Sequence, residues 1–203
     1  MGKGRLEAFS DGVLAIIITI MVLELKLPAG EHWSDLNYTI WSRLIAYALS
    51  FIYIGIYWNN HHHLWHAAEK VNGAMLWANL HLLFWLSLVP LATEWMGNTH
   101  FAAAPVTAYG VMLLMSAIAF SILVATMIRG HGRDSMLAKA IGTDVKGKIS
   151  MGLYALGLGA AFIRPWIGLT FYTIVALIWL IPDRRVEKRL AEHGKPGTQH
   201  HGS

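Results

Sequence analysis

The chain has 203 residues, of which 55% are hydrophobic and 14% are charged, and its formal net charge is +4. Soluble domains carry about 25% charged residues, so this composition indicates an integral membrane protein and excludes an ordinary soluble domain. The basic residues lie in loops between apolar segments and not along one folded face, which argues against a nucleic-acid partner.

The first predicted helix covers residues 5–27 and opens with polar residues at the mouth of an apolar, membrane-length segment. These residues are Arg5, Ser10 and Asp11. Charged side chains are costly in a bilayer and usually pair inside a helical bundle or line an ion pathway. Arg5 and Asp11 lie more than one helical turn apart, so we expect each to find a partner on another span. The second and third predicted spans offer Asn59, Asn60, His61, His62, His63, Asn79 and His81.

A second pattern on the same helix is an aliphatic stripe with spacings i, i+4, i+7 and i+11. Its members are Ile16, Ile20, Leu23 and Leu27. This spacing keeps side chains on one face of a helix with 3.6 residues per turn. Phe9, Gly12 and Thr19 lie close to the stripe, whereas Asp11 lies roughly 140° away at about 100° per residue.

The two faces therefore predict two different roles. Arg5, Ser10 and Asp11 can fix the register of the helix, bind ions directly or relay protons, and the angle of Asp11 favours the first role. For the stripe, ordinary helix packing is the simplest interpretation. The hydroxyl of Thr19 and the charged anchor on the same helix favour another, in which several stripes around an axis form a hydrophobic gate that water leaves readily.

Six apolar runs predict an all-α integral membrane protein with six transmembrane helices, since about 20 residues cross a bilayer. After the first helix they cover residues 44–60, 71–93, 101–128, 149–163 and 165–182. The last two are too long together for one span, and Arg164-Pro165 between them predicts a tight turn. We expect a six-span transmembrane channel domain over residues 1–183 and a basic C-terminal tail over residues 184–203.

The distribution of lysine and arginine predicts the orientation of these spans. If the N-terminus is cytoplasmic, 13 of the 16 basic residues lie on the cytoplasmic side, and the other three are Lys26, Arg43 and Arg164. Positive loops stay in the cytoplasm. We therefore expect both termini in the cytoplasm and a location in the plasma membrane.

A histidine run lies at the end of the second span that we expect to be cytoplasmic, and its members are His61, His62, His63 and His66. His62 and His66 share a helical face at a spacing that can bind zinc. The run contains no carboxylate or thiolate, so interfacial hydrogen bonding or pH sensing is favoured over a metal site.

Small residues inside the fifth span predict close helix packing and not a nucleotide loop. They are Gly152, Gly157 and Gly159, and small residues let membrane helices approach each other. The chain has no cysteine, no Gly-x-Ser-x-Gly elbow and no His-Glu-x-x-His motif, so we expect no enzyme activity and no cofactor.

At the level of motifs, the chain resembles the transmembrane protein 175 family, whose members are lysosomal potassium channels and their prokaryotic relatives. The resemblance is carried by Arg5-x-x-x-Phe9-Ser10-Asp11 at the start of the first span, by Tyr57-Trp58-x-x-His61 in the second, and by Asn79, Pro90 and Thr93 in the third. The animal members have two six-span repeats, so a chain with one repeat is similar to the prokaryotic form, in which four identical chains surround one pore.

The resemblance implies roles for individual residues. The first span of each subunit would line the pore, with its narrowest point at Ile16 and with Thr19, Ile20 and Leu23 facing the pore. The motif residues Arg5, Phe9, Ser10 and Asp11, together with His61 and Asn79, would tie the pore helix to the second and third spans. Neither the family nor this sequence contains a Thr-Val-Gly-Tyr-Gly filter, so Thr19 becomes a candidate ligand for a partly dehydrated K⁺.

The sequence thus predicts a homotetrameric, potassium-preferring channel for monovalent cations in the lipid bilayer, with K⁺ as the permeant ion. The main alternative is a proton-coupled secondary transporter that uses Asp11 and the histidines near the membrane surface. Against it, no inverted repeat or pair of broken helices is visible. A non-conducting membrane scaffold is a further alternative.

Overall fold

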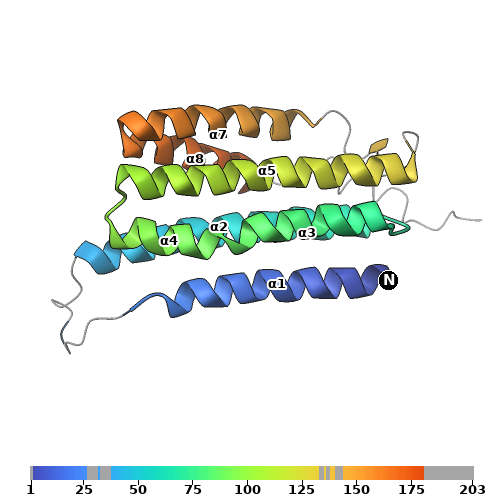
Figure 1. Cartoon of the computed structure of the whole chain (residues 1–203), viewed down its shortest axis with the longest axis horizontal. Helices are drawn as coiled ribbons and strands as arrows, with labels where there is room; N and C mark the ends of the chain where they lie inside the picture. Colours follow the sequence, from blue (N-terminus) through green and yellow to red (C-terminus); the bar gives the residue numbers. More distant parts are fainter. Residues whose placement is uncertain are drawn as a thin grey trace, which may run out of the picture.

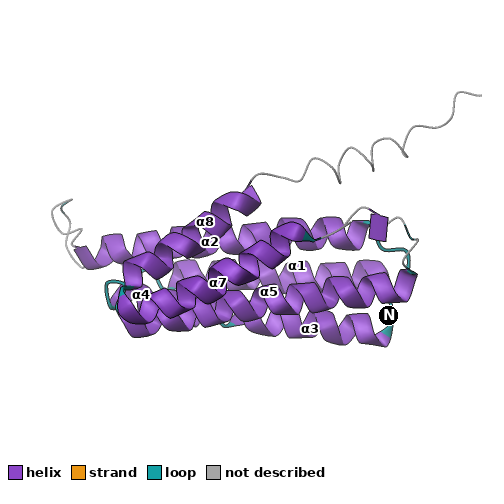
Figure 2. Cartoon of the chain, turned by 90° about the horizontal axis from the view of Figure 1, so that it is seen from above, coloured by secondary structure: helices purple, strands orange, loops and turns teal. Residues whose placement is uncertain are grey.

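The structure, a computed structural model, describes residues 2–26, 32, 38–132, 135, 138–139 and 144–180. All regular structure in this part of the chain is helical, which confirms the all-α prediction (Figure 2). The helices are α1 (Lys3–Leu23), α2 (Tyr38–His66), α3 (Gly73–Ser87), α4 (Val89–Asn98), α5 (Ala103–His131), α7 (Val145–Ile163) and α8 (Pro165–Leu180).

The helices lie side by side along the long axis of the molecule, with α1 at one edge (Figure 1). α1 packs against α2, α3 and α4, whereas α7 packs against α5 and α8. The hydrophobic core fills the space between these helices and contains fully buried side chains such as Tyr53, Leu82, Tyr109 and Tyr172. The edge position leaves one side of α1 without a covering helix.

Within the described residues, four helical segments are long and apolar enough to cross a membrane: α1, α2, the pair α3–α4 and α5. α8 is a shorter apolar helix. The second predicted run ended at residue 60, but α2 continues through the histidine run to His66. Polar side chains at the end of an apolar run do not stop the backbone hydrogen bonds of a helix, so hydropathy alone placed this end too early.

The third predicted span consists of two helices that meet at Leu88. Leu88 separates α3 from α4, and Pro90 stands in the first turn of α4. Proline has no N–H group to donate to the preceding turn, which breaks the helical hydrogen-bond ladder at this point. After the break, α4 packs against α2.

The predicted turn between the last two helices is present, because Arg164 is extended and joins α7 directly to α8. Close packing of these helices depends on Gly157, where an added Cβ would lie 2.7 Å from Cε1 of Tyr172. At Gly152 and Gly159 an added Cβ would meet nothing within 4 Å. The predicted packing role therefore holds for Gly157 and not for the other two glycines.

Two sequence predictions lie outside the described residues. One is Leu27, the last member of the aliphatic stripe, and the other is the basic tail over residues 184–203.

Candidate functional site

The face of α1 that packs against the bundle differs from the predicted stripe. Its buried residues recur every three or four positions and are Leu6, Ser10, Leu14, Ile17 and Met21. This spacing is that of one helical face, which here rests on α2, α3 and α4. Ser10 is the one polar member, and it is completely buried.

The aliphatic stripe lies on the uncovered side of α1. The exposed fractions are 57% for Ile16, 42% for Ile20 and 77% for Leu23, and Thr19 is exposed beside them. Phe9 is also on this side, with 47% exposed, and not among the polar contacts. A continuous apolar face of this kind meets lipid or another protein surface. The stripe is therefore not part of the packing within the chain.

Thr19 presents an oxygen on this exposed face. Its hydroxyl donates to the backbone oxygen of Ile16 at 2.9 Å, within the same helix. The hydroxyl proton is therefore directed at the backbone, and the two lone pairs of the oxygen can accept a hydrogen bond or contact a cation. Hydroxyl and carbonyl oxygens are the type of ligand that replaces the water around an alkali cation.

A buried polar network joins α1 to α2 and α3, and its side chains are those of Ser10, Asn79, His61 and Trp65. Nδ2 of Asn79 donates to Oγ of Ser10 at 2.9 Å, and the Ser10 hydroxyl donates to the backbone oxygen of Leu6. Oδ1 of Asn79 lies 2.7 Å from Nε2 of His61. The structure thus brings together Ser10, His61 and Asn79 from three helices.

Trp65 closes the polar network at its α2 end. Its indole Nε1 donates to Nε2 of His61 at 2.9 Å. This same Nε2 cannot accept from Trp65 and donate to Asn79 at once, so the two contacts are alternatives set by the tautomer of the ring. Every side chain in the polar network is buried, and unpaired polar groups there would be costly. The polar network therefore fixes the rotation of α1 about its own axis.

Asp11 finds its partner on α2, but not among the predicted asparagines and histidines. The indole Nε1 of Trp58 donates to Oδ1 of Asp11 at 3.1 Å. Arg5 is exposed and, within the described part of the chain, its side chain makes no hydrogen bond or ion pair. His81 accepts from Trp85 on its own helix and stays outside the polar network.

Sequence reasoning missed a further contact at the start of α1. Nζ of Lys3 donates to the backbone oxygens of His66 at 3.2 Å and Ala68 at 2.9 Å. A lysine at the C-terminal end of a helix satisfies carbonyls that lack a partner and complements the helix dipole. Trp65 was also missed, although its position one turn after His61 is a signal visible in the sequence.

A groove of about 410 Å³ runs between α1 and the α3–α4 pair. Ile16 and Ile20 line it from α1, and Leu91 lines it from α4. Glu24 and Glu94 belong to the same groove. The exposed face of α1 therefore continues into a hollow that has both apolar and acidic walls.

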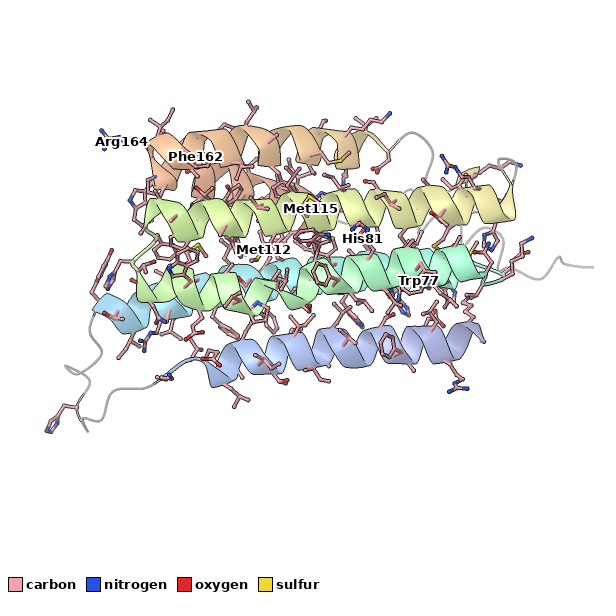
Figure 3. All side chains as sticks on the ribbon, viewed as in Figure 1. Trp77, His81, Met112, Met115, Phe162 and Arg164 are labelled. Atoms are coloured by element: carbon pink, nitrogen blue, oxygen red, sulfur yellow. The ribbon has the colours of Figure 1, made fainter. Side chains whose placement is uncertain are left out.

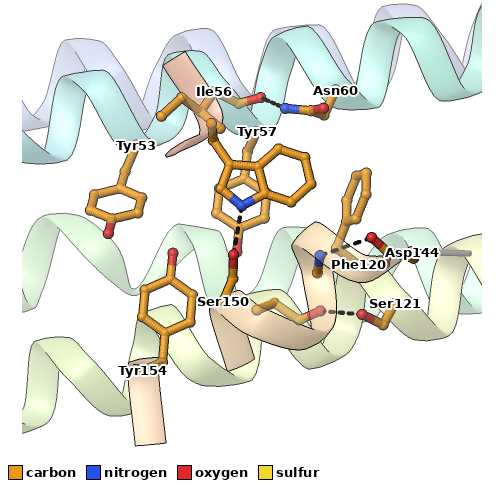
Figure 4. A pocket seen from close by; sticks show the side chains of 12 residues that line it. Tyr53, Ile56, Tyr57, Asn60, Phe120, Ser121, Asp144, Ser150 and Tyr154 are labelled. Carbon is orange, nitrogen blue, oxygen red and sulfur yellow. Dashed lines mark hydrogen bonds between the residues drawn. The ribbon is translucent and has the colours of Figure 1, made fainter. Parts of the chain in front are cut away.

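A separate small cavity of about 40 Å³ lies between α2, α5, α7 and α8 (Figure 4). Tyr57 and Tyr154 line it, and indole Nε1 of Trp179 donates to Oγ of Ser150 at 2.8 Å beside it. No residue of α1 contributes to its lining. A buried water needs about 10–15 Å³, so this space suits a few waters and not an organic ligand.

Comparison with known proteins identifies the family of the chain. A family model described as "Endosomal/lysosomal potassium channel TMEM175" matches residues 5–90. This match runs from α1 to the start of α4 and so includes the aliphatic stripe and the whole polar network.

Three individual proteins are similar to the chain. One, described as a potassium channel of Chryseobacterium sp. (strain P1-3), is 61% identical over 193 residues, covering 95% of this chain and 100% of the relative. The human "Endosomal/lysosomal proton channel TMEM175" is 33% identical over 106 residues, covering 46% of this chain and 21% of the human protein.

The third is a crystal structure described as a lysosomal potassium-selective channel TMEM175 homolog from Chamaesiphon minutus. It has a TM-score of 0.73 and 28% sequence identity, and it covers 90% of this chain and 97% of that chain. The resemblance stated from the Arg5 to Asp11 motif therefore extends over nearly the whole chain, and the protein belongs to the TMEM175 family.

Proposed function

We propose that this multi-pass membrane protein is one subunit of a potassium-preferring channel that conducts monovalent cations passively. The observation that carries this proposal is the division of α1 into two faces. Hydrogen bonds that Ser10 and Asp11 accept from α3 and α2 fix one face on the bundle, whereas Ile16, Ile20 and Leu23 are left uncovered. Such a helix is built to present its apolar side in one fixed direction.

The pore is completed by further copies of the chain. Four subunits around one axis bring four α1 helices together, with Ile16 at the hydrophobic constriction and with Ile20, Leu23 and Leu27 along the rest of the pore. Water leaves such a constriction readily, so ions pass only when the four side chains move apart. In this proposal, the other copies of the chain therefore supply the pore-lining helices that a single chain lacks.

Thr19 is the proposed contact for K⁺. Its hydroxyl proton is donated to the backbone oxygen of Ile16 in the same helix, which leaves the lone pairs of the hydroxyl oxygen available to an ion on the proposed pore axis. K⁺ loses its water at a lower cost than the smaller Na⁺, and a ring of four neutral hydroxyls suits the larger ion. A ring of single hydroxyls also predicts a modest preference for K⁺.

Arg5, Phe9, Ser10, Asp11, His61 and Asn79 are the proposed structural motif of the pore helix. Ser10, His61 and Asn79 share the polar network, and Asp11 bonds to Trp58. These contacts support a role in holding α1 in position and do not leave Asp11 or His61 free as carriers in a proton-coupled transporter.

The proposed topology has six spans within residues 1–183 in the plasma membrane, with both termini and the tail 184–203 in the cytoplasm. α7 and α8 supply the fifth and sixth spans, and the distribution of basic residues supports the orientation. Arg43 and Arg164 then lie on the outer side of the membrane.

Measurement of ion flux into liposomes that contain the purified protein tests the proposal. Purified protein in vesicles with a potassium gradient is expected to carry K⁺ flux that exceeds Na⁺ flux. Ile16→Asn adds a polar group at the constriction and is expected to raise the flux and to change the ion preference. The matched control is Ile174→Asn, at an exposed isoleucine on α8, far from α1. If Ile16→Asn leaves both flux and preference as they were, the constriction is not at this residue.

The description of the human relative as a proton channel favours proton conduction as a second candidate function. The same vesicles, loaded with a pH-sensitive dye and given a potassium gradient, measure both ions together. Acidification that proceeds without K⁺ flux would select the second candidate, and uptake of an organic substrate that saturates and needs a proton gradient would select a transporter.

A further inference from the structure

The end of α1 near Leu23 is tied to the bundle by a single arginine on α2. Nε of Arg43 donates to Oδ1 of Asn98 at 2.6 Å, and its Nη1 donates to the backbone oxygen of Lys26 at 3.3 Å. Asn98 is the last residue of α4, and Lys26 follows the end of α1. One guanidinium therefore joins α1, α2 and α4, and we call this group the outer clamp.

The outer clamp lies where α2 and α4 pack tightly against each other. An added Cβ at Gly97 would lie 2.9 Å from Cα of Arg43, so the backbones of α2 and α4 are in direct contact at this level. The guanidinium is also planar and presents its N–H groups in a fixed fork, which makes its direction well defined. The contact with Lys26 therefore transmits the position of the α2–α4 pair to α1.

The outer half of α1 has little else to hold it in place by hydrogen bonds. The contacts of Lys3, Ser10 and Asp11 all belong to the inner half of the helix. Thr19 bonds within its own helix, and packing in the outer half rests on apolar residues such as Ile17 and Met21. Among the described residues, the outer clamp supplies the one hydrogen bond from another helix to the stretch from residue 12 to residue 26.

We propose that Arg43 is a positioning residue of the channel, and this inference rests on the proposed function. Because the inner half of α1 is fixed, the motion that remains is a displacement of the outer half. Arg43 opposes this displacement through Lys26 and so sets the separation of the Leu23 side chains around the pore. It thereby controls how often the pore conducts and leaves the ion preference at Thr19 unchanged.

Glu24 and Glu94 line the same small cavity as Arg43. The experiment therefore has to distinguish the effect of the Arg43 charge from the effect of its hydrogen bonds. Both hydrogen bonds of the outer clamp go to neutral oxygens. Arg43→Lys keeps the charge and removes the fork. Asn98→Ala keeps every charge and removes the acceptor of the Arg43 Nε, together with the hydrogen bond from Nδ2 of Asn98 to Glu94 within α4. The matched control is Arg164→Gln, which removes an exposed positive charge at the turn between α7 and α8, far from α1 (Figure 3).

The experiment measures distances between α1 helices together with single-channel currents. The chain contains no cysteine, so Leu23→Cys carries one spin label per subunit, and pulsed electron resonance gives the label distances in the assembled protein. Arg43→Lys and Asn98→Ala are each expected to broaden these distances, and Arg164→Gln is expected to leave them as they are. Open probability without the label is expected to change about fivefold, which corresponds to about 1 kcal/mol for one hydrogen bond.

The double variant Arg43→Lys/Asn98→Ala is expected to match the stronger single variant, because both substitutions break the same contact. Additive effects, or label distances that stay the same in both single variants, would overturn the role of the outer clamp. If no variant and no parent protein conducts K⁺, but the distances still broaden, the clamp is supported and the proposed function fails. If Arg43→Lys does not fold, the label distances of Asn98→Ala alone test the role of the outer clamp.

Discussion

At the scale of single residues, Asn79 is the side chain on which the stability of the polar network depends most. This amide is the link between Ser10 on α1 and His61 on α2, and all three side chains are buried. Ser10 keeps a second contact to Leu6, whereas the carboxamide of Asn79 has no substitute in the packed interior. The interaction between three helices therefore depends on one side chain.

Asn79→Ala is expected to destabilise the protein by about 2–3 kcal/mol, because it leaves buried polar groups of Ser10 and His61 with fewer partners. The control is Asn60→Ala, since the amide of Asn60 donates to Ile56 within its own helix. Asn60→Ala is expected to cost less than about 1 kcal/mol. Thermal unfolding in detergent, followed by size-exclusion chromatography, compares the two. Equal losses would mean that the polar network adds nothing beyond a local contact.

At the scale of helices, two glycines in α7 with similar sequence positions have opposite surroundings. An added Cβ at Gly157 would lie 2.7 Å from Tyr172 and 2.9 Å from Phe171 of α8, while one at Gly159 would meet open space. Gly157→Ala is expected to push α7 and α8 apart and to cost about 1–3 kcal/mol. Gly159→Ala is expected to stabilise the helix by up to about 1 kcal/mol. The order of the two melting temperatures checks this, and the reverse order would contradict the α7–α8 contact.

The helices and the hydrogen bonds between them differ in how far the sequence predicts them. Apolar runs located the helices, and the period of 3.6 residues located the exposed face of α1, because both are local properties of the chain. Hydrogen bonds between helices are not local. Asp11 pairs with Trp58, 47 positions away, and no spacing rule distinguishes this indole from the nearby asparagines. The contacts of Lys3, and the contact of Arg43 with Lys26, go to backbone oxygens, which every residue possesses, so residue type gave no indication of them.

At the scale of the whole molecule, the helices of the chain are arranged asymmetrically. α1 lies at one edge, and α7 and α8 lie away from it (Figure 1). The half formed by α1 to α4 contains the exposed stripe, the polar network and the outer clamp. The other half contributes none of these contacts. In the proposed tetramer, assembly through α1 would place the conducting surface at the centre and leave α7 and α8 at the periphery, facing lipid.

Under the proposed function, assembly depends on the direction in which α1 presents its stripe, and we expect the hydrogen bond between Trp58 and Asp11 to help set this direction. Asp11→Ala removes the acceptor of the Trp58 indole, and Trp58→Phe removes only its donor N–H and keeps an aromatic ring. Both substitutions are expected to lower the fraction of tetramer, Asp11→Ala more strongly, and to leave the K⁺ over Na⁺ preference of the remaining tetramers unchanged, because this carboxylate lies off the stripe. Mass photometry of the purified protein gives the tetramer fraction, and reversal potentials give the preference. Intact tetramers with an altered ion preference would place Asp11 in the conduction path and not in the support of the helix.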